Sequence, residues 1–190
     1  MNNTLILVAG LPGAGKTRFA DYLSNRLQAP LICKDRIKET VWDRIMYDTN
    51  NRDNSQIYGR LAYDLSFSFC ETLLKTRQPV VFESNFVKPA DEILHSMVQK
   101  YEYTVINVLF GGDYNVIHKR FVERDVTGER HPGLVSNGFF NDFEVYKKAA
   151  QNCENFLYGD VVINVDATDF SNIIYDDIVE RILGSCHVNC

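Results

Sequence analysis

The eight residues Gly10 to Thr17 read Gly-Leu-Pro-Gly-Ala-Gly-Lys-Thr and fit the spacing Gly-x-x-x-x-Gly-Lys-[Ser/Thr]. They follow the apolar run Leu5–Ala9 and precede a stretch with helical periodicity, which is the setting of a phosphate-binding loop. Glycines let backbone N–H groups turn toward phosphate oxygens, and a helix that begins near Gly15 adds the positive end of its dipole. The alternative, a chance glycine turn between a strand and a helix, is not favoured because every diagnostic position matches.

We expect the whole loop to bind the phosphates of a nucleotide. Lys16 would reach the β- and γ-phosphates as an exposed, catalytic lysine, and the Thr17 hydroxyl would ligate Mg²⁺. The expected phosphate-binding residues are Gly10, Leu11, Pro12, Gly13, Ala14, Gly15, Lys16 and Thr17.

A carboxylate and three cations follow the second apolar run, in Lys34-Asp35-Arg36-Ile37-Lys38. Ligands of parallel sheets bind beyond the carboxyl ends of the strands, so Asp35 stands where a carboxylate could accept the proton of an attacking hydroxyl. We interpret Asp35 as catalytic and Lys34 and Lys38 as substrate-facing. The alternative is that Asp35 caps the next helix and the cations form a solvated face.

The third apolar run ends in Val80-Val81-Phe82-Glu83-Ser84-Asn85. In phosphate-loop enzymes an acid at this position holds Mg²⁺ or orients the nucleophile. We therefore predict Glu83 as a metal or substrate contact and Asn85 as a substrate contact. An ordinary polar residue at the end of a buried strand remains the alternative.

Arg120 and Arg124 are four residues apart, on one face of an expected helix, and the Gly/Pro loop Thr127–Gly133 follows and carries Arg130. The planar guanidinium matches phosphate oxygens, which favours a lid over approximately 124–137 that closes on the phosphates. We predict Arg120 and Arg124 as catalytic and all three arginines as nucleotide-binding. The alternative is a solvated helix face with salt bridges to Glu123 and Asp125.

Apolar, β-branched runs alternate with helical periodicity along the chain, which predicts an α/β fold with a parallel sheet and helices on both faces. The five expected strands are Leu5–Ala9, Leu31–Cys33, Val80–Phe82, Val105–Phe110 and Val161–Val165. One helix is predicted from a stripe at four-residue steps, Ile57, Leu61, Leu65, Phe69 and Leu73, and the last helix is expected to end near Gly184.

The composition indicates one domain over residues 1–190, because Pro and Gly are few and do not cluster. A formal charge of −5 argues against broad attraction to nucleic acid or anionic membranes. We find no apolar stretch of membrane-spanning length and no secretory leader, so we expect a cytoplasmic protein. The five scattered cysteines fit reduced thiols, and Cys186-His187-Val188-Asn189-Cys190 fits a frayed tail better than a zinc site.

With these motifs the chain resembles the P-loop kinase group of AAA-type ATP-binding proteins, which is related to polynucleotide 5′-hydroxyl kinase, chloramphenicol phosphotransferase and zeta toxins. The resemblance rests on Gly10–Thr17, Lys34–Glu39, Glu83–Asn85, the arginine pair and Arg130–Gly133, and it runs through most of the chain. It implies a three-layer P-loop NTPase fold with strand order 2-3-1-4-5, ATP with Mg²⁺ as cofactors, Asp35 as the acceptor-activating carboxylate and an arginine lid. It also implies that Asp166-Ala167-Thr168 passes near the adenine.

These observations predict an ATP-dependent kinase that transfers the γ-phosphoryl group to a hydroxyl of a small molecule or nucleotide. Two alternatives stay open: a polynucleotide 5′-hydroxyl kinase, and an ATPase or nucleotide-dependent switch whose only acceptor is water. A nucleic-acid acceptor is less favoured because of the negative net charge. We expect no membrane partner, and the sequence gives no indication of the oligomeric state.

Overall fold

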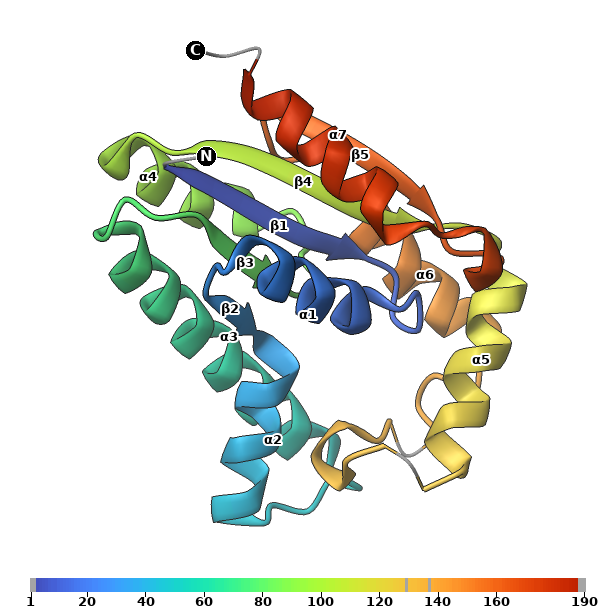
Figure 1. The fold of residues 1–190 in the computed structure, drawn as a ribbon. Helices are drawn as coiled ribbons and strands as arrows, with labels where there is room; N and C mark the ends of the chain where they lie inside the picture. The colour runs from blue at the N-terminus through green and yellow to red at the C-terminus, as the bar shows by residue number, and fades with distance from the viewer. Residues whose placement is uncertain (1–2, 129, 137, 188–190) are drawn as a thin grey trace.

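The computed structural model describes residues 3–128, 130–136 and 138–187. Its five strands form one parallel sheet in the order β2-β3-β1-β4-β5, which confirms the predicted fold and strand order (Figure 1). The strands are β1 (Thr4–Gly10), β2 (Leu31–Cys33), β3 (Val80–Glu83), β4 (Thr104–Gly111) and β5 (Val161–Asp166).

Helices cover both faces of this sheet because successive side chains of each strand point to opposite faces. Ile6 and Val8 pack into one apolar cluster with α1 and α7, whereas Leu5 and Leu7 pack into another with α3 and α4. The helices are α1 (Lys16–Leu27), α2 (Lys34–Ile45), α3 (Arg52–Leu74), α4 (Ala90–Tyr101), α5 (Tyr114–Val126), α6 (Phe143–Glu154) and α7 (Tyr175–His187).

The carboxyl ends of β1, β2 and β3 meet at one edge of the sheet. The loop Gly10–Thr17 begins there after β1, and α2 begins there directly after β2. In Figure 1, α2 and α5 extend away from this edge on opposite sides of a gap, and the segment after α5 runs back toward α2. That segment contains the short 3₁₀ helix η1 (Pro132–Leu134), and a second one, η2 (Phe170–Asn172), follows β5.

Two helical expectations need correction. Ile57, Leu61 and Phe69 are 60%, 40% and 51% exposed, so the predicted stripe does not form the buried face of α3. The buried face is formed instead by Ala62, Ser66, Phe67, Cys70 and Leu74. The helix α7 also continues through Gly184 to His187.

No helix within the described ranges is both long enough and apolar enough to cross a membrane. The cysteines Cys33, Cys70 and Cys153 are buried and carry free thiols. Residues 188–190 of the expected tail lie outside the described residues, and in the described part no group of three or more His, Cys, Asp or Glu residues could hold a metal ion.

Candidate active site

The phosphate loop connects β1 to α1, and its glycines are required by its shape. Gly10, Gly13 and Gly15 all have positive φ angles, a region that other residues rarely adopt. A Cβ atom at Gly10 would lie 2.0 Å from the Phe110 carbonyl oxygen of β4. The Tyr146 hydroxyl of α6 donates to the Pro12 carbonyl over 2.9 Å and fixes the outer part of the loop. The loop therefore has one well-defined conformation.

Lys16 is buried, with 6% of its surface exposed, and is not the exposed lysine that the sequence suggested. Its Nζ donates to the Leu11 carbonyl over 2.8 Å, so the ammonium lies across its own loop. Burial lowers the pKa of Lys16, although the nearby carboxylates Glu83 and Asp35 act in the opposite direction. Because burial disfavours the charged form of Lys16, an anion beside it would stabilise the ammonium, and its remaining N–H groups could donate to that anion.

Glu83 ends β3 and is 3% exposed. Its Oε2 lies 3.4 Å from the Thr17 hydroxyl and accepts a hydrogen bond from the Cys33 thiol at 2.9 Å. Burial raises the pKa of Glu83, and the Lys16 ammonium opposes that rise. The structure thus brings together the two oxygen donors expected at a Mg²⁺ site, the Thr17 hydroxyl and the Glu83 carboxylate.

Asp35 lies in the first turn of α2, directly after β2. The helix N-cap position is Cys33, and no side chain caps it, so Asp35 does not have the capping role considered above. Its carboxylate instead pairs with the Lys34 Nζ at 2.6 Å. Burial would raise the pKa of Asp35, but the Lys34 ammonium, together with the charges of Lys16 and Arg130, outweighs burial and lowers that pKa to about 2. Asp35 is therefore ionised at neutral pH.

The three predicted arginines take different positions. Arg120 donates to the carbonyls of Ala167 and Thr168 and lies over the ring of Phe170 at 4.0 Å, so it anchors the loop after β5. Arg130 pairs with Asp125 at 2.5 Å. Arg124 forms no ion pair within the described residues, and burial together with the Arg130 charge lowers its pKa. Glu123 pairs with Lys119 at 3.9 Å, so among the described residues neither Glu123 nor Asp125 forms the expected alternative salt bridge with Arg120 or Arg124.

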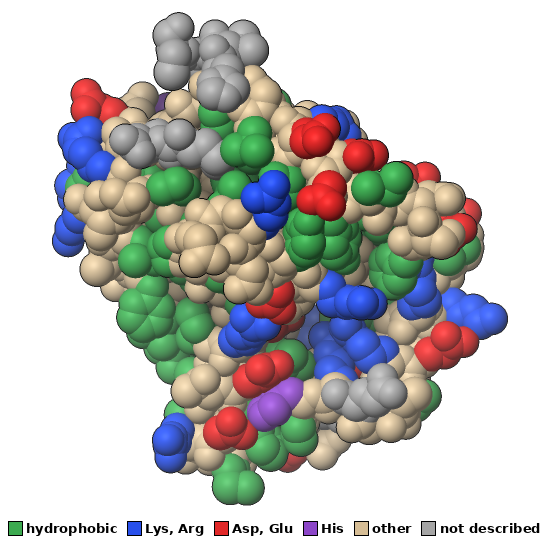
Figure 2. Space-filling view, in the orientation of Figure 1, with side chains coloured by type: hydrophobic (Ala, Val, Ile, Leu, Met, Phe, Trp, Pro, Cys, Tyr) green, Lys and Arg blue, Asp and Glu red, His purple; other side chains and the backbone are tan. Residues whose placement is uncertain are grey.

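Two adjoining cavities lie at this edge of the sheet. The first, which we call the loop cavity, has a volume of about 510 Å³ and is lined by the phosphate loop, Glu83 and the arginines of α5. Figure 2 shows Lys and Arg side chains gathered in this hollow, between α1 and α5. Its cations are Lys16, Arg18, Arg120, Arg124 and Arg130.

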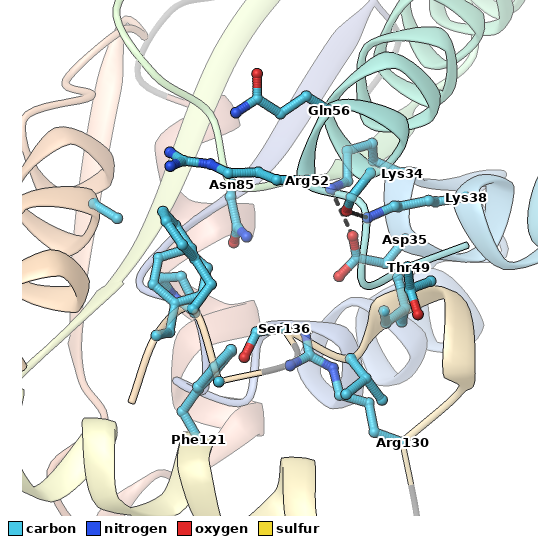
Figure 3. Close-up of a pocket in the computed structure, with 18 of the residues that line it drawn as sticks. Lys34, Asp35, Lys38, Thr49, Arg52, Gln56, Asn85, Phe121, Arg130 and Ser136 are labelled. Carbon is cyan, nitrogen blue, oxygen red and sulfur yellow. Dashed lines mark hydrogen bonds and ion pairs between the residues drawn. The ribbon is translucent and has the colours of Figure 1, made fainter. Parts of the chain in front are cut away.

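The second, the side cavity, has a volume of about 700 Å³ and lies between α2, the start of α3 and the segment after α5 (Figure 3). Asp35, Asn85 and Arg130 line both cavities and stand at their junction. Lys34 and Lys38 line only the side cavity. A group in the loop cavity and a molecule in the side cavity would therefore meet at Asp35.

The described part of the predicted lid, 124–128 and 130–136, packs against α2 and the residues directly after it. The Tyr47 hydroxyl donates to the Gly133 carbonyl over 3.3 Å, and His131 contacts Asp43 over 3.1 Å. Gly133 lies so close to Trp42 that a Cβ atom there would come within 2.6 Å of the Trp42 Cβ. The segment thus covers the side cavity from the direction of α5.

Several site residues have no counterpart in the sequence predictions. Arg52, Ser55 and Gln56 of α3 line the side cavity, and Phe170 lies beside Gly15 and Arg120 in the loop cavity. Asn51 offered a weak sequence signal for the start of α3, because Asn is common at helix N-caps, and its side chain does cap this helix. Nothing in the sequence indicated that this helix begins beside Asp35.

Whether phosphates fit the loop cavity can be judged from its unpaired donors. Arg120 Nη1 and Arg130 Nε are buried without a hydrogen-bond partner among the described residues, and both residues line this cavity. Buried donors are ordinarily hydrogen-bonded, so an anion would satisfy them. The phosphate loop, the strand order and two acids, Asp35 after β2 and Glu83 at the end of β3, define a P-loop domain of the kinase type.

Residues 5–138 match the family model described as an AAA domain, and the chain belongs to that family. Among solved structures, a protein of Chloroflexus aurantiacus J-10-fl that is provisionally named a kinase is 25% identical, with a TM-score of 0.84 and complete coverage of both chains (100% and 100%). No functionally curated protein matches the chain.

Two more distant structures share the fold. A sugar kinase from Janibacter sp. HTCC2649 is 15% identical, with a TM-score of 0.58 and coverage of 96% of this chain and 93% of that one. The shikimate kinase of Bacteroides thetaiotaomicron is also 15% identical, with a TM-score of 0.56 and coverage of 97% and 98%.

Proposed function

We propose that this protein is a kinase that transfers the γ-phosphoryl group of ATP to a hydroxyl group of a small molecule or nucleotide. The observation that carries the proposal is the position of Asp35 at the junction of two cavities, one lined by the phosphate loop and the other large enough for a second molecule. Kinases of known fold, among them the sugar and shikimate kinases above, support the same reading.

The loop cavity supplies what a transferring phosphoryl group needs. In this reaction charge accumulates on the phosphoryl oxygens, and catalysis consists largely of positioning and electrostatic stabilisation. Lys16 and Arg124 would donate to these oxygens, and Arg120 would hold the loop after β5 beside the nucleotide. Thr17 and Glu83 would hold Mg²⁺, which neutralises phosphate charge when bound.

Asp35 would act on the acceptor. The acceptor oxygen forms a bond to the γ-phosphorus, the bond between that phosphorus and the β–γ bridging oxygen breaks, and the hydroxyl proton passes to Asp35. A carboxylate with a pKa of about 2 is a weak base, so its main work is to orient the hydroxyl and to take the proton late. A loose transition state requires no more, because the attacking oxygen forms little bond before the leaving group departs.

The test is to measure ADP formation with and without a panel of hydroxyl acceptors, and to identify the phosphorylated product by mass spectrometry. We expect turnover to rise with at least one small acceptor. ADP formation at one rate whatever the acceptor would favour the ATPase alternative, and salt-sensitive end labelling of a 5′-hydroxyl oligonucleotide would favour the polynucleotide kinase.

A further inference from the structure

The side cavity is lined by more positive than negative side chains. Its lining holds the cations Lys34, Lys38, Arg52 and Arg130 and, within the described residues, the single carboxylate Asp35. This contrasts with the chain as a whole, whose formal charge is −5. Positive charge is therefore concentrated at this concave surface as well as in the loop cavity.

Two of these cations are already neutralised. Lys34 pairs with Asp35 at 2.6 Å, and Arg130 pairs with Asp125 at 2.5 Å. The other two, Lys38 and Arg52, have no carboxylate partner in the described part of the chain. The surplus charge thus resides on Lys38 and Arg52.

The contacts of these two side chains leave donors available. Lys38 Nζ donates to the Ser55 hydroxyl over 3.3 Å, which uses one of three ammonium donors. The Arg52 guanidinium lies over the ring of Phe139 at 4.1 Å, a contact that uses the face of the group and none of its N–H donors. Asp35, Lys38 and Arg52 surround the same cavity in Figure 3.

We propose that Lys38, Arg52 and Ser55 form an oxyanion site, so that the acceptor is an acidic alcohol bearing a phosphate or carboxylate group in addition to the hydroxyl presented to Asp35. This inference rests on the proposed kinase function. The anion supplies the missing negative charge, and an Arg fork and a Lys point charge on the wall of one cavity suit either group. A cavity of about 700 Å³ has room for one small molecule around that pair.

The environment of Lys38 agrees with this assignment. Burial, followed by the charge of Lys34, lowers the pKa of Lys38 to about 8, while Asp35 acts in the opposite direction and Arg130 adds to the lowering. An anion that binds here would raise the pKa of Lys38 again and favour its charged form. The bound anion and Lys38 would stabilise each other.

The direct test is a titration with inorganic phosphate, followed by thermal unfolding. A saturating, non-hydrolysable ATP analogue first fills the loop cavity, so that phosphate reports on the remaining site. We expect saturable stabilisation of the wild type, with phosphate affinity roughly 10- to 100-fold weaker in Lys38→Gln and in Arg52→Gln. Unchanged affinity in both variants, or no saturable phosphate site in the wild type, would overturn the proposal.

The controls are Arg60→Gln and Lys75→Met. Arg60 is an exposed residue two turns further along α3, and Lys75 is exposed at the end of that helix; neither lines a cavity. Both variants should bind phosphate as the wild type does. If they weaken binding as much as Lys38→Gln and Arg52→Gln, a general loss of positive charge explains the effect and the assignment is wrong.

Failure of the kinase function itself has a separate signature. If the ATP analogue does not bind, the proposed function fails, and the titration is repeated in a Lys16→Ala background, where the phosphate loop is disabled. The Lys38 and Arg52 substitutions still report on the oxyanion site there. Their effect persists if the site exists and disappears if it does not.

Matched acceptors then separate the two anions. Glucose is compared with gluconate and glucose 6-phosphate, and adenosine with adenosine 5′-monophosphate, each at equal concentration with ATP. We expect the charged member of each pair to be phosphorylated faster or to inhibit more strongly. Comparison of gluconate with glucose 6-phosphate then shows whether the site prefers a carboxylate or a phosphate group. Equal behaviour of neutral and charged members throughout, in rate and in inhibition, would contradict an acidic acceptor.

Discussion

The two cavities that meet at Asp35 are built in opposite ways. The loop cavity is bounded by strand ends and a glycine loop, and its key side chains Lys16 and Glu83 are 6% and 3% exposed. The side cavity is bounded by helices and the segment after α5, and its wall includes the exposed Arg52 and the 39% exposed Phe139.

The loop cavity would thus supply the groups for phosphoryl transfer, and the side cavity would supply the groups that select the acceptor. In the proposed reaction, backbone geometry and buried charge would hold the phosphates, and any acceptor requires these contacts. The acceptor would contact side chains of α2, α3 and the lid segment, where substitutions can change the shape and charge of the site without disturbing the core. Acceptor specificity should therefore depend on α2, α3 and the lid segment, and catalysis on the loop cavity.

The largest effect is expected from Lys16→Ala. Removal of the ammonium should abolish measurable phosphoryl transfer and weaken nucleotide binding, since a single preorganised donor commonly contributes ~10²–10³-fold to kcat and Lys16 also contacts the ground-state phosphates. Circular dichroism should show a folded protein, because burial of this charge is unfavourable without an anion. Turnover near that of the wild type would refute the role of the loop cavity.

Asp35→Asn should reduce kcat by ~10²–10⁴-fold while nucleotide affinity stays close to that of the wild type. The variant removes the proton acceptor at the junction and leaves the phosphate contacts in place. Binding is followed with a fluorescent ATP analogue, and Asp64→Asn, an exposed acid on α3, serves as the matched control. A collapse of nucleotide affinity would place Asp35 in the donor site instead.

The arginines should divide into two roles. In Arg124→Lys we expect kcat to fall on the order of tenfold, less than the loss of a whole donor, because charge is kept but the planar fork is lost. In Arg120→Lys we expect the nucleotide KM to rise instead, since Arg120 holds the Ala167 and Thr168 carbonyls. Identical profiles for both variants, measured by steady-state kinetics, would remove this distinction.

The smallest effect is a pH dependence of acceptor binding. Lys38 carries its charge below its pKa of about 8 and loses it above, so the KM for an acidic acceptor should rise as pH increases through 8. The rise should approach tenfold per pH unit at most, in a setting where Lys34, Asp35, Arg52 and Arg130 face the same cavity. Lys38→Arg should flatten the profile between pH 7 and 10; an unchanged profile would assign the titration to another group.

The loop cavity was largely predictable because each part has a local signature. The glycine spacing, the strand before it and the acid after the third strand are all readable within a few residues, and the parallel sheet then brings them together. Thr17 and Glu83 were each predicted as metal ligands, and the adjacency of β1 and β3 brings them within 3.4 Å of each other. The burial of Lys16 was missed, since it depends on packing around the loop.

The side cavity could not be predicted to the same extent. Lys38 and Arg130 stood beside recognisable motifs, but Arg52 and Ser55 come from a helix whose sequence indicated only periodicity. The predicted stripe on α3 is displaced from the true buried face, which is formed by Ala62, Ser66, Phe67, Cys70 and Leu74. Residues brought together only by tertiary packing leave no local pattern in the chain.

The contact of Gly133 with Trp42 and Tyr47 makes one mechanical unit of the lid segment and α2, the helix that also carries Asp35 and Lys38. A nucleotide held by Arg124 and Arg130 and an acceptor held by Lys38 would both stabilise this one docked arrangement. Thermodynamic reciprocity then requires that each ligand tighten the binding of the other by the same factor. We therefore expect donor and acceptor to bind cooperatively, because the close packing of Gly133 on Trp42 couples the lid segment to α2.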